Sequence, residues 1–153
     1  MPKVSMLALI ARILLVPYTV ALGLVVWLPG DQASQVTGIV ARLARSLAYR
    51  LDVPFLYTYT VFEFLANIAL FVPFGLLLAL AWSRLKTWHL AVLGLVTSGL
   101  IEFVQLFLSS RFSTVSDLVA NTAGAVVGCL FVRITARLAS TPAFDESRRV
   151  AVR

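Results

Sequence analysis

The stretch that decides the fold is residues 101–128, IEFVQLFLSSRFSTVSDLVANTAGAVVG, where polar side chains interrupt two long apolar segments. Glu102 is followed three residues later by Gln105, so both lie on one face of a helix. Asp117 and Asn121 are four residues apart and share a face in the same way. A carboxylate at the centre of a membrane-spanning helix costs about 2.5–3.5 kcal/mol on insertion scales, so such residues usually face a protein interior. The stretch therefore predicts two packed helices that carry inward-facing polar groups.

A third acid–amide pair lies upstream, where Glu63 precedes Asn67 by four residues. Three helices would then each offer a carboxylate and an amide, and Arg111 is the obvious countercharge. We expect the functional site where these residues meet, toward the outer ends of the helices. The alternative interpretation is structural, because membrane helices also use polar pairs to fix their packing register.

The composition indicates an integral membrane protein. Of the 153 residues, 60% are hydrophobic and 13% are charged, which is too little charge for the surface of a soluble domain. The net charge of +6 does not indicate nucleic-acid binding, because the basic residues are dispersed around apolar segments. Membrane lipids with anionic headgroups are the simpler partner.

Four apolar segments are long enough to span a bilayer, at about 20 residues each. They cover residues 6–28, 62–82, 88–108 and 116–135. Residues 35–51 carry apolar side chains at helical spacing and predict an amphipathic helix, either in the outer interface or folded back over the bundle. The expected fold is all-α: a four-helix transmembrane bundle in one domain, 1–138, followed by a flexible cytoplasmic tail, 139–153.

The distribution of Lys and Arg predicts the orientation in the membrane. With the N-terminus inside, nine of the 13 basic residues lie on the cytoplasmic side and four lie outside, so both termini are expected in the cytoplasm. The four on the outer side are Arg42, Arg45, Arg50 and Arg111.

Small residues and a proline mark the expected helix contacts. Gly124 and Gly128 are four residues apart in the fourth span, the spacing that permits close approach of a second helix. Pro73 interrupts the second span and removes one backbone hydrogen bond, which a bundle tolerates when neighbours satisfy the free carbonyl. Gly75 follows two residues later and lets another backbone come close.

These residues resemble a known family. The combination of FEFLANIALFVPFG with IEFVQLF and then R-x5-D-L-x2-N-x2-G-x3-G is similar to the VanZ-like membrane proteins. The resemblance implies a small bacterial cytoplasmic-membrane protein, related to one linked to lowered susceptibility to the lipoglycopeptide teicoplanin. The motif positions carried over are Glu63, Asn67, Pro73, Gly75, Glu102, Gln105, Arg111, Asp117, Asn121, Gly124 and Gly128. Relatives often have further acids between the Arg and the Asp, where this chain has Thr114 and Ser116.

Catalytic and metal chemistry have weaker support. His89 starts the third span at the face opposite the serines near the cluster, so a Ser-His-Asp arrangement is excluded by depth. Cys129 and His89 also differ in depth, which argues against a nucleophile–base pair. An oxygen-only site for Mg²⁺ or Ca²⁺ from Glu63, Glu102 and Asp117 is an alternative, but no spacing is diagnostic. The prediction therefore includes no metal and no cofactor.

The sequence favours a binding protein over an enzyme. The expected ligand is an amphiphile, either a lipid, a lipoglycopeptide or a lipid-linked envelope precursor, whose polar head meets the cluster in the outer leaflet. Two alternatives remain open: an enzyme that modifies a lipid-linked envelope intermediate, and a small ion-coupled transporter that uses the carboxylates as a relay.

Overall fold

The computed structural model describes residues 5–27, 30–105, 107 and 115–140, and within these the chain forms five helices and no strand. The helices are α1 (Met6–Trp27), α2 (Gly30–Leu51), α3 (Phe55–Ala81), α4 (Thr87–Gln105) and α5 (Val115–Ser140). All except α2 are long and apolar enough to cross a membrane. The predicted all-α fold with four spanning helices is confirmed.

Three boundaries of the spanning helices differ from the predicted spans by three residues or more. α3 begins at Phe55 and not at residue 62. Within this added segment, the hydroxyls of Thr58 and Thr60 donate to the carbonyls of Phe55 and Leu56 at 2.9 and 3.0 Å, so these polar side chains are satisfied inside the helix. α4 ends at Gln105, before residue 108. α5 continues to Ser140, beyond residue 135. Most of the predicted tail lies outside the described residues.

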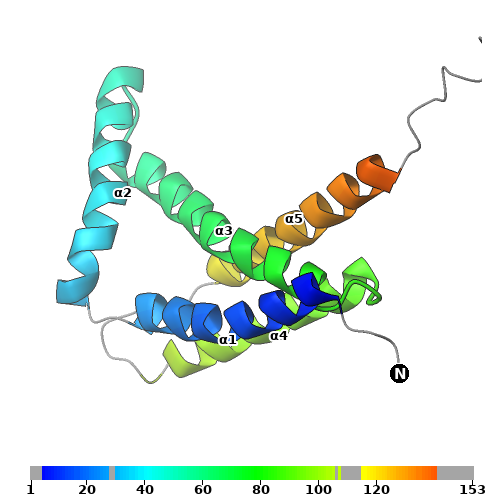
Figure 1. Cartoon of the computed structure of the whole chain (residues 1–153). Helices are drawn as coiled ribbons and strands as arrows, with labels where there is room; N and C mark the ends of the chain where they lie inside the picture. The colour runs from blue at the N-terminus through cyan, green and yellow to red at the C-terminus, as the bar shows by residue number, and fades with distance from the viewer. Residues whose placement is uncertain (1–4, 28–29, 106, 108–114, 141–153) are drawn as a thin grey trace, which may run out of the picture.

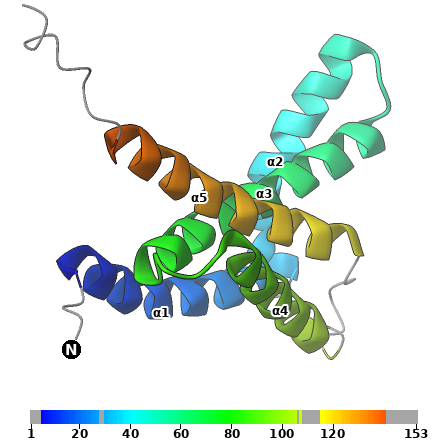
Figure 2. The same ribbon diagram turned by 90° about the vertical axis from the view of Figure 1, so that its right-hand side faces the viewer.

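The chain runs back and forth through the bundle. α3 and α5 cross at the centre with the largest interface, while α1 packs mainly on α3 and α4 mainly on α5 (Figures 1 and 2). The first residues of α1 and the last of α5 lie toward the same side of the molecule (Figures 1 and 2). α2 and the beginning of α3 form a hairpin at the opposite end.

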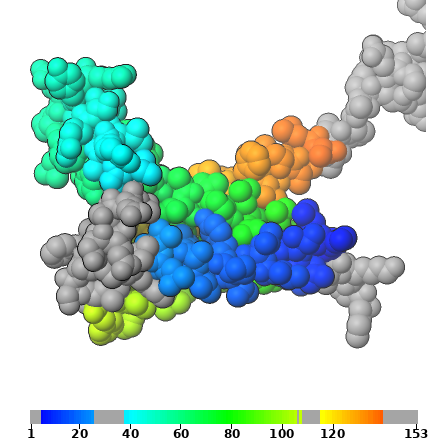
Figure 3. All heavy atoms as spheres, turned by 60° about the vertical axis from the view of Figure 1, so that its left-hand side comes forward, coloured from blue at the N-terminus to red at the C-terminus, as the bar shows by residue number. Residues whose placement is uncertain are grey.

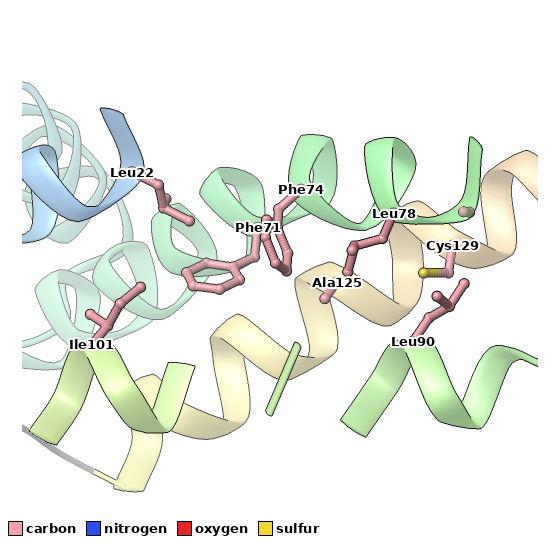
Figure 4. Packing of buried hydrophobic residues seen from close by; sticks show 9 residues of the cluster. Leu22, Phe71, Phe74, Leu78, Leu90, Ile101, Ala125 and Cys129 are labelled. Carbon is pink, nitrogen blue, oxygen red and sulfur yellow. The ribbon is translucent and has the colours of Figure 1, made fainter. Parts of the chain in front are cut away.

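The core lies where α3 meets α5. Phe71, Phe74 and Leu78 of α3 face Ala125 and Cys129 of α5. Leu22 from α1 and Ile101 from α4 approach Phe71 from two sides (Figure 4). The phenylalanine rings meet edge to face, with centroids 5.7 Å apart. Most other apolar side chains of the spanning helices point outward, as expected where lipid is the solvent.

Three glycines set the closeness of α3 and α5. A Cβ at Gly75 would overlap the backbone of Ala125, and one at Gly128 would overlap the backbone of Val72 and Leu76. A Cβ at Gly124 would overlap the carbonyl of Ile68. The two backbones are therefore in direct contact, which leaves no room between them for any other residue type.

Tyr18 ties α1 to α3 beside the internal proline. Pro73 lacks the amide that would donate to the carbonyl of Ala69. The Tyr18 hydroxyl donates to the next carbonyl, that of Leu70, at 2.6 Å. The helix continues through Pro73, so a side chain from α1 supports the backbone on the turn that the proline weakens.

Two arginines close the turn between α3 and α4. Nε and an Nη of Arg12 donate to the carbonyl of Ala81 at 3.2 and 3.1 Å, and the guanidinium lies 5.6 Å from the centroid of the Trp82 ring. Arg133 of α5 donates to the carbonyl of Leu85. The carbonyl of Ala81, at the end of α3, lacks a partner within the helix and carries partial negative charge, which explains the cation beside it.

Candidate functional site

The site is built where α4 ends and α5 begins, against the middle of α3. Asn67 of α3 donates from Nδ2 to Oδ1 of Asp117 at 2.6 Å. Asp117 lies in the first turn of α5, where the helix dipole favours a negative charge. This contact joins two of the predicted site residues across 50 positions of the sequence.

A second hydrogen bond joins α4 and α5. Asn121 of α5 donates from Nδ2 to Oγ of Ser98 at 2.9 Å, and both side chains are buried. Sequence reasoning missed Ser98. The signal was available, because Ser98, Glu102 and Gln105 are spaced by four and three residues and so share one face of α4.

Glu102 and Gln105 are both buried, with 9% and 6% of their surfaces exposed. They lie in the last turn of α4 on the same face as Ser98, which is turned toward α5. The carboxamide of Gln105 can both donate and accept hydrogen bonds. The carboxyl of Glu102 accepts hydrogen bonds and can also donate one when it is protonated. This face of α4 is therefore polar along two turns inside an otherwise apolar bundle.

Each asparagine lies one turn from an acid on its own helix and also forms a hydrogen bond with a residue of another helix. Asn67 of α3 donates a hydrogen bond to Asp117 of α5, and Asn121 of α5 donates one to Ser98 of α4. The spacing rule placed each acid and amide on a common face, and the helix crossing then brought the faces of α3, α4 and α5 together. A layer of polar groups results at the end of the bundle away from the chain ends.

Two further residues of the predicted site are Glu63 and Arg111. Glu63 is one turn before Asn67 on α3, but its side chain is exposed. Arg111 lies outside the described residues, so its predicted role as countercharge stays a prediction. Among the described residues, no three His, Cys, Asp or Glu side chains form a group that could hold a metal ion.

The candidate nucleophiles are placed for packing. His89 is in the first turn of α4 and stacks on Trp88 with ring centroids 3.6 Å apart. Ser98 is nine residues further along, about 13 Å at 1.5 Å per residue, which is beyond hydrogen-bond reach. The Cys129 thiol is buried and donates to the carbonyl of Gly75 at 3.3 Å.

Comparison with known proteins gives one match. The family model described as VanZ/LLP1 matches residues 15–136, which include α2, α3, α4 and most of α1 and α5. The search of curated proteins and the search of solved structures gave no match.

Proposed function

Because the chain belongs to the VanZ/LLP1 family, we propose that it binds the polar head of a membrane amphiphile in the layer formed by α3, α4 and α5. The ligand's acyl chain would lie along the apolar outer faces of these helices. The biological result would be lowered sensitivity to teicoplanin-type lipoglycopeptides, either through capture of the drug or through binding of the lipid-linked precursor that it targets.

One observation supports this proposal: hydrogen-bonding side chains from α3, α4 and α5 gather in one part of an apolar bundle. Asn67 with Asp117 and Ser98 with Asn121 offer amide, hydroxyl and carboxylate groups beside buried Glu102. Such groups suit the hydroxyls and amides of a glycolipid or glycopeptide head. Polar groups within membrane-spanning helices are costly, which supports a functional use in addition to helix packing.

The proposal is tested by binding of teicoplanin to the purified chain in lipid nanodiscs. We expect Asp117→Ala to weaken binding by about tenfold or more, because a hydrogen bond to a charged group contributes about 1.5–3 kcal/mol. The matched control is Thr135→Ala on the same helix, whose exposed hydroxyl bonds only to carbonyls of its own helix.

Teicoplanin from which the acyl chain has been removed provides the second comparison. The proposal expects it to bind more weakly than the intact drug, since the acyl chain contributes apolar contact with the helices. Equal binding of both forms, or equal binding to wild type and Asp117→Ala, would count against an amphiphile site at this position.

We further propose that the protein lies in the bacterial cytoplasmic membrane with both ends in the cytoplasm. The excess of Lys and Arg at the side of the chain ends supports this orientation. A phosphatase reporter that is active only outside the cytoplasm, fused after Arg153, is expected to be inactive. The same reporter inserted in the α2–α3 turn at Asp52 is expected to be active, and the reverse pattern would overturn the orientation.

A further inference from the structure

The α2–α3 hairpin projects from the bundle of spanning helices. In the space-filling view its outer end stands clear of the spanning helices (Figure 3). α2 runs across the direction of α1 and does not follow it through the bundle (Figures 1 and 2). A helix in that orientation lies roughly parallel to the plane of a membrane that α1 crosses.

Among the described side chains of α2, the most buried are alanines. Ala44 and Ala48 are buried, and α2 packs against α3. Ile39 and Leu43 are one helical turn apart and are each 53% exposed, and Leu51 is 59% exposed. α2 therefore presents an apolar stripe that no described part of the protein covers.

A basic stripe runs beside the apolar one. Arg42, Arg45 and Tyr49 are spaced by three and four residues and all three are exposed. The guanidinium of Arg45 lies 5.4 Å from the centroid of the Phe55 ring, which holds it at the hairpin surface. Residues 30–62 contain three arginines and two acids, Asp31 and Asp52, so the hairpin carries a net charge of +1, and its arginines lie between residues 42 and 50.

Aromatic residues surround the hairpin tip. The chain turns there through Asp52, which adopts a left-handed conformation (φ 51°), while the amide of Val53 donates to the carbonyl of Ala48 at 3.1 Å. Tyr49 and Tyr57 are exposed on either side of this turn. Tyrosine beside arginine is typical of the headgroup region of a membrane, where amphipathic rings and cations are both solvated.

The length of α3 places the hairpin at that region. With 27 residues at about 1.5 Å each, α3 extends for about 40 Å, whereas the hydrocarbon core of a bilayer is about 30 Å thick. α3 is therefore long enough to carry its first turns, and α2 packed on them, to the headgroups on the side opposite the chain ends.

We propose that α2 is a docking surface for anionic phospholipid headgroups. Ile39, Leu43 and Leu51 insert among the upper acyl-chain segments, and the guanidinium groups of Arg42 and Arg45 bind lipid phosphates. This surface is separate from the polar layer of α3, α4 and α5. Its effect is to gather anionic lipids at the end of the bundle where that layer lies.

The test uses the full chain in nanodiscs with a fluorescent label at the apolar stripe. A Cys129→Ser background keeps a donor for the carbonyl of Gly75, and Leu43→Cys carries an environment-sensitive nitrobenzoxadiazole dye. Quenching is compared between nitroxide-labelled phosphatidylglycerol and nitroxide-labelled phosphatidylcholine at equal content. We expect stronger quenching by the anionic lipid. The preference should fall by about fivefold for each arginine removed, since each contributes about 1 kcal/mol near an anionic surface.

Two variant pairs make the test specific. Arg42→Gln with Arg45→Gln should abolish the preference, whereas Arg84→Gln with Lys86→Gln removes the same charge from the other side of the bundle and should preserve it. Arg42→Gln alone leaves the Arg45–Phe55 contact intact and should give an intermediate value. Equal quenching by both lipids overturns the headgroup proposal. A label quenched by aqueous iodide and by neither lipid overturns membrane docking altogether.

Discussion

Gly128→Ala is expected to prevent stable packing of α5 on α3. The added Cβ would overlap the carbonyl of Val72 and would lie 2.7 Å from the amide nitrogen of Leu76. These are backbone atoms of a continuous helix, so no side-chain rotation relieves the overlap. Overpacking typically costs 1–3 kcal/mol, and here we expect a loss of about 3 kcal/mol or more, because the whole helix must move. Thermal unfolding of the purified protein in detergent measures the change.

Gly99→Ala is the matched control for that substitution. Gly99 lies within α4, where nothing lies within 4 Å of the position of a Cβ. Alanine in a helix is favoured over glycine by about 0.5–1 kcal/mol, so this variant should melt at the same temperature as wild type or slightly higher. If Gly128→Ala melts like Gly99→Ala, then α3 and α5 do not meet at the glycines.

The spanning helices could be predicted because lipid simplifies the problem. A helix such as α1 buries few side chains and exposes apolar ones, so hydropathy alone locates it and no packing partner is needed. The start of α3 was missed for the same reason. Phe55–Val61 contains hydroxyl-bearing residues, which lower the hydropathy of a segment that is nevertheless helical.

The residues of the polar layer could be predicted in part. Acid–amide spacing identified Asn67, Asp117 and Asn121, since a shared helical face is a local property. It did not identify which helix each would contact, and it overlooked Ser98, because a serine costs little in a membrane helix and gives no signal in hydropathy. Glu102 is buried and Glu63 is exposed. This difference depends on how the helices cross, which cannot be read from the residues near either position.

The two substitutions Glu102→Gln and Glu102→Leu are expected to give opposite results. Glu102 is buried on the polar face of α4, between Ser98 and Gln105. Glutamine has nearly the same size and still accepts and donates hydrogen bonds, so Glu102→Gln should fold and should bind teicoplanin within about threefold of wild type. Leucine removes the polar group and leaves its neighbours without that partner, at a cost of about 1–3 kcal/mol.

That cost corresponds to a loss of binding of about fivefold to 150-fold in Glu102→Leu, and cells that express this variant should lose the lowered sensitivity to the drug. The comparison also separates the proposed function from its rivals. An enzyme or a proton-coupled transporter needs a group that takes up and releases a proton, which glutamine does not do. If Glu102→Gln melts like wild type but protects cells no better than Glu102→Leu, then Glu102 acts by proton transfer. A binding role at this layer would then be wrong.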